Sequence, residues 1–130
     1  MSTIFSKIIS GEIPCHKIHE NDDFIAFLDV NPIAKGHTLI VPKFEVDYIF
    51  DMNNDQFSDF HLYSKKIALA IKKSIPCLKI GTAVIGLEVP HAHIHLVPMN
   101  EVGDLNFSST RKVFTPKEFA EIAKLISSNL

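Results

Sequence analysis

The sequence predicts an α+β fold in which an antiparallel sheet of about five strands packs against a long central helix and a C-terminal helix. Short apolar, β-branched runs alternate with turn-forming residues, which is typical of antiparallel strands. One long stretch and one shorter C-terminal stretch instead repeat their apolar residues at helical spacing, which indicates amphipathic helices. The 130 residues fit a single domain, residues 1–130.

The first part of the chain predicts a short helix followed by a hairpin. Residues 3–9 place apolar side chains at helical intervals, and Gly11 is suited to end that helix. Two strand-like runs, residues 17–20 and 24–28, flank the Asn and Asp residues at 21–23. Because Asn and Asp tolerate turn dihedrals, we expect these two runs to pair as a hairpin.

The middle of the chain predicts a buried strand and then the long helix. Residues 37–41 are apolar and β-branched, and Pro42 ends the run. Asn53 with Gln56 three residues later resembles a capping box, and Pro76 stops the helix. Its apolar stripe consists of Phe57, Phe60, Ser64, Ile67, Ile71 and Ile75.

Two more strands and a final helix complete the expected order. Residues 79–85 and 91–97 are the expected strands. Thr115 then supplies an N-cap, Pro116 the first helical position and Glu118 the partner that closes the capping box.

Composition excludes several classes of protein. Hydrophobic residues make up 46% and charged residues 22%, as in globular domains. The formal charge of −2 gives no basic surplus for nucleic-acid binding, and no apolar run is long enough for a membrane span. Cys15 and Cys77 form no CxxC motif, and residues 1–11 lack the apolar core of a secretory signal. We therefore expect a cytoplasmic protein with two thiols that behave as small apolar residues.

Three histidines at alternate positions, His91, His93 and His95, are the unusual feature of the sequence. In a strand they would share one face, with Ala92, Ile94 and Leu96 on the other face, toward a core. Three interpretations compete. The face is polar by chance, the imidazoles bind a metal such as zinc, or they handle phosphate with a neutral imidazole as nucleophile.

The segment His91-Ala92-His93-Ile94-His95-Leu96-Val97 resembles the signature of the histidine triad (HIT) family. Residues 3–14 resemble the N-terminal motif of the Hint branch of that family. Residues 26–32 and 36–43 resemble its next two motifs. The resemblance covers most of residues 3–98, with four motifs in the family's order.

The resemblance implies a homodimer and attack on the α-phosphorus of a purine nucleoside phosphoramidate or a dinucleoside polyphosphate. His93 would be the nucleophile, and a nucleotidyl-histidine would release a nucleoside monophosphate to water. His91 and His95 would orient His93, bind phosphate oxygens and assist the leaving group, and His37 would stand behind the triad. The chemistry implies no cofactor and no metal.

The resemblance also implies that Asp29 holds the ribose hydroxyls. The base would lie among Ile4, Phe5, Ile8, Phe27 and Val30. These roles compete with plainer ones. Phe5, Phe27 and Val30 could be core residues, Asp29 a turn former and His37 a buried histidine with satisfied hydrogen bonds. We interpret the remaining histidines as surface residues: His16, His19 and His61.

The sequence departs from the family in two respects, its zinc-ligand positions and its phosphate-binding positions. Relatives often hold structural zinc where this chain has Thr3, Ser6 and Glu45, so we expect no structural zinc. Leu87 and Met99 stand where relatives often carry Gln and Arg, so the phosphate end has fewer donors. This loss favours an altered rate or substrate choice, or a second hypothesis: a nucleotide-binding regulator with little turnover.

Overall fold

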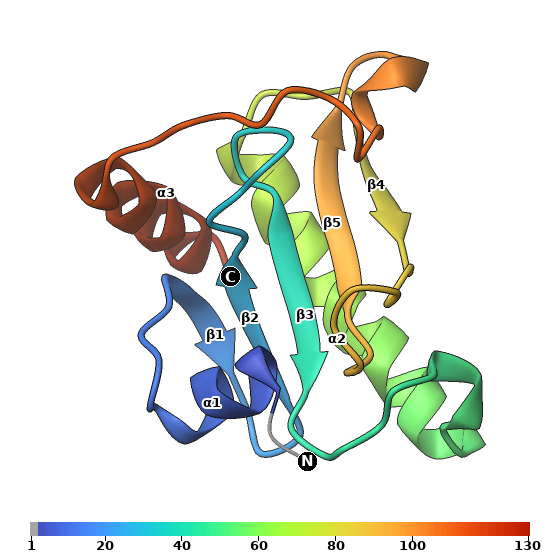
Figure 1. The fold of residues 1–130 in the computed structure, drawn as a ribbon. Coiled ribbons are helices and arrows are strands. Elements are labelled where there is room, and N and C mark those ends of the chain that lie inside the picture. Colours follow the sequence, from blue (N-terminus) through green and yellow to red (C-terminus); the bar gives the residue numbers. More distant parts are fainter. Residues whose placement is uncertain (1–2) are drawn as a thin grey trace.

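The computed structural model describes residues 3–130 and has five strands, three α-helices and two short 3-10 helices (Figure 1). All strand pairs are antiparallel, in the order β1-β2-β3-β5-β4. The α+β prediction is therefore confirmed. In chain order the elements are α1 (Ile4–Ser10), β1 (Lys17–Glu20), β2 (Phe24–Leu28), β3 (Thr38–Pro42), η1 (Ile49–Asp51), α2 (Asn54–Ser74), β4 (Lys79–Ala83), β5 (Ile94–Met99), η2 (Val102–Asp104) and α3 (Pro116–Ser128).

Local signals place the helix ends where the sequence predicts them. Asn53 and Gln56 form a reciprocal capping box at the start of α2. Thr115 and Glu118 do the same for α3. Gly11 ends α1 at a φ of 86°, a left-handed conformation that glycine adopts without strain. The capping boxes satisfy amide groups that the start of a helix leaves unpaired, and the Gly11 amide donates to the Ile8 carbonyl at the end of α1.

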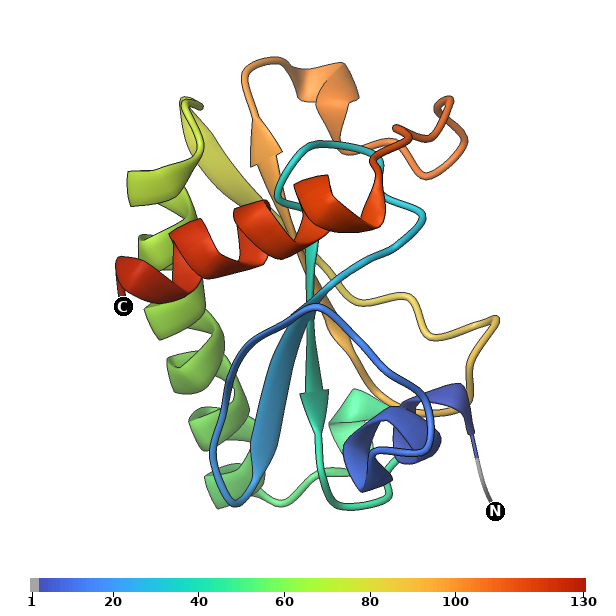
Figure 2. The ribbon, with the colours of Figure 1, turned by 90° about the vertical axis from the view of Figure 1, so that its left-hand side faces the viewer.

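The alternation of side chains along the strands divides the interior into two cores. In β2, Phe24, Ala26 and Leu28 face the larger core, which α2 and α3 cover. Ile25 and Phe27, the residues between them, face a smaller core with Phe5 of α1. Figure 2 shows α2 on one side of the sheet, and α1 with residues 84–93 on the other. Because α1 is short, loops cover the rest of that second face.

Two strands begin or end differently from the prediction. β5 begins at Ile94, so His91 and His93 precede it, and β4 ends at Ala83 rather than at residue 85. The reason lies in the backbone hydrogen bonds. The amide of His91 donates to the Val89 carbonyl and that of Ala92 to the Val46 carbonyl, outside the sheet ladder. The predicted alternation still holds, because the core receives Ala92, Ile94 and Leu96.

A further strand and two histidines also differ from the prediction. β3 covers Thr38–Pro42, one residue later than expected. His16 and His19 are half-buried instead of surface-exposed. His16 stacks on Phe119, and His19 bonds the Tyr63 hydroxyl at 2.9 Å. Within residues 3–130, no helix combines the length and apolar character that a bilayer crossing requires.

Candidate active site

A cavity of about 350 Å³ lies on the α1 side of the sheet, between α1, the end of β2 and the loop that precedes β5. The predicted residues Asp29, His93 and His95 line it, together with the five residues expected around the base. Phe27 of β2 and His95 of β5 face this side of the sheet, Asp29 and His93 lie just beyond the ends of those strands, and α1 brings its apolar side chains. The other lining residues include Cys15, Asn31, Leu39, Arg111 and all of residues 85–89.

The apolar end of the cavity is formed by Ile4, Phe5, Ile8, Phe27 and Val30. Phe5 and Phe27 are buried and meet edge to face, with ring centroids 6.0 Å apart. They are therefore both core residues and cavity walls, so a core role and a place beside the base do not exclude each other. Val30 is 67% exposed and belongs to the rim instead of the core.

His93 is held in a single neutral tautomer. Its Nδ1–H donates to the His91 carbonyl at 2.8 Å, which leaves the lone pair on Nε2. The edge of Phe5 packs against the ring, with centroids 4.8 Å apart. Burial lowers the pKa of His93, because desolvation disfavours the charged imidazolium. His93 therefore has the protonation state of a nucleophile.

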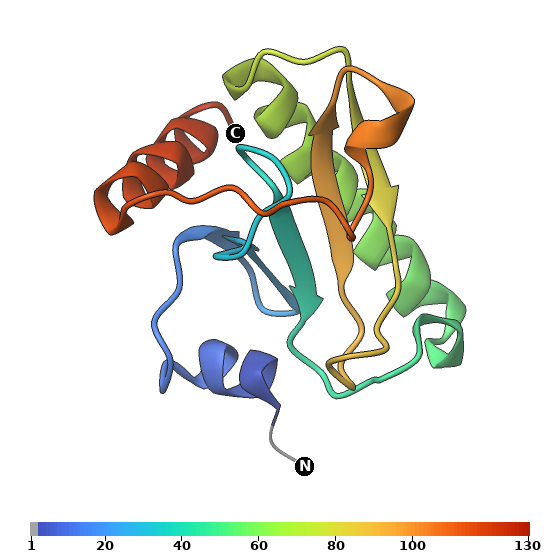
Figure 3. The same ribbon diagram turned by 45° about the horizontal axis from the view of Figure 1, so that its top comes forward.

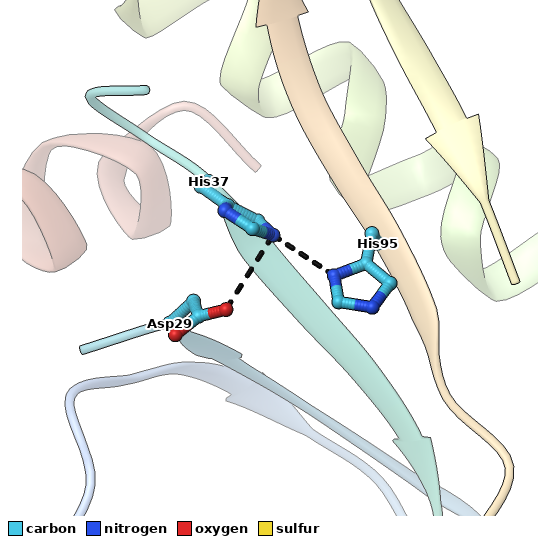
Figure 4. A group of neighbouring side chains, drawn as sticks. All are labelled: Asp29, His37 and His95. Atoms are coloured by element: carbon cyan, nitrogen blue, oxygen red, sulfur yellow. Dashed lines mark hydrogen bonds and ion pairs between the residues drawn. The ribbon is translucent and has the colours of Figure 1, made fainter. Parts of the chain in front are cut away.

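His37 and His95 form a hydrogen-bond chain behind His93. The amide of Ile33 donates to Nδ1 of His37 at 3.1 Å, so the proton of His37 lies on Nε2. That Nε2–H donates to Nδ1 of His95 at 2.9 Å, which places the His95 proton on its own Nε2. In Figure 4 the second nitrogen of His95 points away from His37. His95 is thus a neutral donor.

Burial also sets the charge state of this pair. Desolvation lowers the pKa of His37 to about 4 and that of His95 to about 3. The carboxylate of Asp29 opposes the shift at His37, and the positive charge of Arg111 adds to it at both histidines. Both imidazoles are therefore neutral at pH 7.

Asp29 stands at the end of β2 with one oxygen toward His37. Its Oδ1 accepts from the Asn31 amide at 2.8 Å, and its Oδ2 lies 3.6 Å from Nε2 of His37 (Figure 4). The Asn31 bond is the turn-former geometry that the sequence offered as an alternative. Because Asp29 also lines the cavity, the carboxylate remains available to a ligand.

Asp29, His37 and His95 also form, within residues 3–130, the one group whose possible metal-ligand atoms all lie within 4.8 Å of one another. Their hydrogen bonds favour a proton-linked chain over a metal site. Because the Ile33 amide occupies the lone pair of Nδ1, the Nε2 of His37 is protonated and has no lone pair for a cation. The triad His91, His93 and His95 is not such a group among the described residues.

His91 does not line the cavity. Its Nε2–H donates to the Pro42 carbonyl at 2.8 Å, so Nδ1 accepts from the Thr3 hydroxyl at 3.3 Å. Both ring nitrogens are thus used inside the protein. The geometry supports an orienting role through the backbone carbonyl that holds His93, and it leaves no ring nitrogen for a phosphate oxygen.

Sequence reasoning missed Arg111 and Phe107, which the segment before α3 brings to the site. Figure 3 shows this segment crossing the sheet beside the loop that joins β2 to β3. The Phe107 ring packs on His95 at 4.6 Å and on His37 at 6.0 Å. No periodicity or motif in the sequence signals either residue, because their partners lie far away along the chain.

The Cys15 thiol also lines the cavity. Burial raises the pKa of this thiol, so it stays protonated and inert near neutral pH. This agrees with the apolar role that the sequence predicts for the cysteine.

Known proteins match this chain in sequence and in fold. A model of the HIT domain matches residues 10–102. An adenosine 5′-monophosphoramidase of Schizosaccharomyces pombe is 32% identical over 132 residues, which cover 100% of this chain and 99% of that protein. An uncharacterized HIT-like protein of Methanocaldococcus jannaschii is 36% identical over 126 residues, 92% of this chain and 97% of that protein. The crystal structure of a Hit-like protein from Bartonella henselae has a TM-score of 0.85 at 32% identity, covering 99% of this chain and 96% of that chain. By sequence and by fold, the chain belongs to the histidine triad (HIT) family.

Proposed function

We propose that this protein is a nucleotide hydrolase or transferase that acts on nucleoside 5′-phosphoramidates or dinucleoside polyphosphates. It attacks the α-phosphorus through His93 and releases a nucleoside monophosphate. Family membership and a relative named as an adenosine 5′-monophosphoramidase support the substrate class.

The single observation that carries the proposal is the pair of tautomers held by His93 and His95, which both line the cavity. His93 keeps its lone pair on Nε2, because Nδ1–H is bound to a carbonyl. His95 keeps its proton on Nε2, because its Nδ1 accepts from His37. The ring centroids of the two histidines lie 4.9 Å apart. One phosphate group can therefore meet a nucleophile and a donor together.

In the first step, the Nε2 lone pair of His93 forms a bond to the α-phosphorus. The bond from phosphorus to the leaving group breaks, and its electron pair departs with that group. When the nitrogen of a phosphoramidate is protonated, it leaves as a neutral amine, so no further proton is required. The Nε2–H of His95 donates to a phosphoryl oxygen as the charge redistributes. His93 now carries the nucleotide and a positive charge, with its Nδ1–H still on the His91 carbonyl.

In the second step, water attacks the same phosphorus. The bond from phosphorus to Nε2 breaks, its electron pair returns to His93, and the water gives up one proton to solvent. The products are a nucleoside monophosphate and the neutral histidine of the resting protein. Another acceptor in place of water makes the same chemistry a transfer.

The remaining cavity residues suit a purine nucleoside. Phe5, Phe27 and the nearby aliphatic side chains offer an apolar wall for the base. Asp29 offers carboxylate oxygens to the ribose hydroxyls. His91 orients the nucleophile through its carbonyl, and His37 fixes the tautomer of His95.

A second candidate function is nucleotide binding with little turnover. It is favoured by the exposed wall at residues 85–88. Leu87 lines the cavity, is 90% exposed and has no hydrogen-bond donor in its side chain. Glu88 beside it adds a negative charge where an anionic substrate would lie.

The proposal includes a homodimer. Within residues 3–130, β4 is an edge strand whose one neighbour in the sheet is β5, and edge strands accept another strand. Exposed apolar side chains lie on α2 and after β4: Leu62, Leu69 and Val84. Light scattering after size exclusion tests this assembly, and a monomer mass would contradict it.

The test of the reaction is intact-mass spectrometry with adenosine 5′-phosphoramidate, together with quantitation of released AMP. Wild type, His93→Ala and His61→Ala are compared. His61 is the matched control, because it is an exposed histidine on α2 outside the cavity. We expect AMP release by wild type and by His61→Ala, and none by His93→Ala.

AMP release by a folded His93→Ala variant would refute the assigned nucleophile. Calorimetric titration with AMP separates the two candidate functions. Binding without release by wild type would favour the regulator, and absence of both would refute each candidate.

A further inference from the structure

We propose that Arg111 is a substrate-contacting residue that binds a phosphate group beyond the α-phosphate and so favours substrates with a phosphate-chain leaving group. This inference rests on the proposed function and extends it to the choice of substrate. It starts from the charges around the cavity. Of the described residues that line it, Arg111 is the one Lys or Arg, and it shares the cavity with His93 and His95.

Arg111 is held in place by groups on two segments. Its Nη1–H donates to the Asn31 carbonyl and its Nη2–H to the Phe107 carbonyl, both at 3.0 Å. The guanidinium carbon lies 5.9 Å from the centroid of the Phe107 ring. The next residue, Lys112, fixes the backbone by donating its amide to the Pro32 carbonyl at 2.8 Å. A preorganised arginine loses little side-chain entropy when it binds an anion.

These bonds leave further N–H donors on the guanidinium. The two carbonyls are neutral, so these bonds do not compensate the positive charge of Arg111. A planar guanidinium with spare donors matches a phosphate group, which accepts paired N–H bonds. Glu88, the exposed acid of the cavity rim, is screened by water and offsets this charge only weakly.

The position of Arg111 relative to the histidines indicates which phosphate it meets. Phe107 connects it to His95, because the Phe107 ring packs on that imidazole. The guanidinium of Arg111 lies over the same Phe107 ring, so Arg111 stands beside the donor His95. In-line displacement places the leaving group on the side of phosphorus opposite the nucleophile.

Met99, at the end of β5, packs its side chain over Gly81 and does not line the cavity. Arg111 reaches the cavity from a different segment, twelve positions further along the chain. The segment before α3 therefore supplies a strong phosphate donor that the end of β5 does not.

The experiment compares the binding of AMP and ADP by calorimetry, which needs no turnover. Wild type is expected to bind ADP more tightly than AMP by about 10-fold, the effect of one charge-assisted hydrogen bond. Arg111→Gln is expected to remove this preference while leaving AMP affinity within about 3-fold. Arg111→Lys is expected to keep part of the preference, since it retains charge but loses the planar fork.

Lys112→Gln is the matched control, because it removes the same charge from an exposed neighbour that does not line the cavity. We expect this variant to bind both nucleotides as wild type does. If Arg111→Gln weakens AMP and ADP equally, Arg111 holds the α-phosphate or the loop, and the proposal is overturned. A wild type that binds AMP and ADP equally overturns it as well.

A kinetic arm uses diadenosine tetraphosphate and adenosine 5′-phosphoramidate. We expect Arg111→Gln to lower kcat/KM about 10-fold for the tetraphosphate and less than about 3-fold for the phosphoramidate. Equal losses would overturn the assignment. An ADP preference that depends on Arg111, in a protein that releases no AMP from either compound, would uphold Arg111 as a phosphate ligand while refuting the proposed reaction.

Discussion

The two faces of the sheet are built from alternate residues of the same strands, yet they have different roles. One face packs against fully buried apolar side chains of α2 and α3, such as Phe60, Ile67 and Ile126. The face under α1 buries four histidines: His37, His91, His93 and His95. Each of these imidazoles has a named partner, and burial lowers the pKa of three of them, His37, His93 and His95. Burying four polar imidazoles costs stability, and the apolar face must offset that cost.

The largest expected effects are a loss of activity at His93, on one face, and a loss of stability at Phe60, on the other. His93→Ala should lower AMP release from the phosphoramidate by at least about 1,000-fold, because the nucleophile is lost. It should leave the protein folded. Phe60→Ala should instead lower the free energy of unfolding by about 3–5 kcal/mol, since Phe60 is fully buried in the larger core.

Urea denaturation and AMP release, measured on the same samples, check this contrast. The activity per folded Phe60→Ala molecule should match wild type. A Phe60→Ala protein that is stable but inactive would mean that the two faces are coupled, and the contrast would fail.

A second prediction concerns pH. The pKa of His37 is about 4 and that of His95 about 3 in the folded protein, below the value near 6.5 expected in the unfolded chain. The unfolded chain therefore binds more protons below pH 6.5. Stability should be greatest above that pH and should fall as pH drops toward 4, by at most about 2 kcal/mol per histidine between pH 7 and pH 5.

Urea denaturation at a series of pH values measures this slope. His37→Gln should have a smaller slope than wild type, because one of the two buried imidazoles no longer titrates. His61→Gln, at an exposed position of α2, should keep the wild-type slope. Identical slopes in all three proteins would show that the buried histidines do not govern acid unfolding.

A third prediction tests the cavity wall at residues 85–88, where Leu87 has no side-chain hydrogen-bond donor. Leu87→Gln adds an amide N–H to a side chain that already lines the cavity. We expect turnover to rise by about 10-fold, the value of one transition-state hydrogen bond. Leu125→Gln is the control, because Leu125 is exposed on α3, away from the cavity. An unchanged rate for Leu87→Gln would show that this wall does not reach the reacting phosphate.

Local signals in the sequence predicted most of the fold and part of the site. The capping box of Asn53 and Gln56 and the alternation along β2 are short-range, so the sequence alone could locate them. The start of β5 could not be found that way, since the amide of Ala92 bonds Val46, a residue far along the chain. The place of Arg111 in the cavity likewise depends on Asn31, 80 residues earlier.

The smallest expected effect concerns Thr3, which ties the N-terminal end of α1 to the histidine segment. Its hydroxyl accepts from the Ser6 amide at 3.1 Å and donates to Nδ1 of His91. Thr3→Val removes both bonds at nearly constant volume, and we expect a loss of about 1 kcal/mol in the free energy of unfolding. Thr3→Ser should restore most of it.

The same two variants show whether the Thr3 hydroxyl only caps α1 or also positions the ring of His91. If the hydroxyl only caps α1, Thr3→Val should change stability while the KM for the phosphoramidate stays fixed. Because His91 carries the carbonyl that holds His93, and Phe5 on α1 packs against His93, we expect the KM to rise several-fold as well. A fixed KM with lowered stability would confine Thr3 to the helix end. It would leave the carbonyl of Pro42 as the contact that holds the His91 ring.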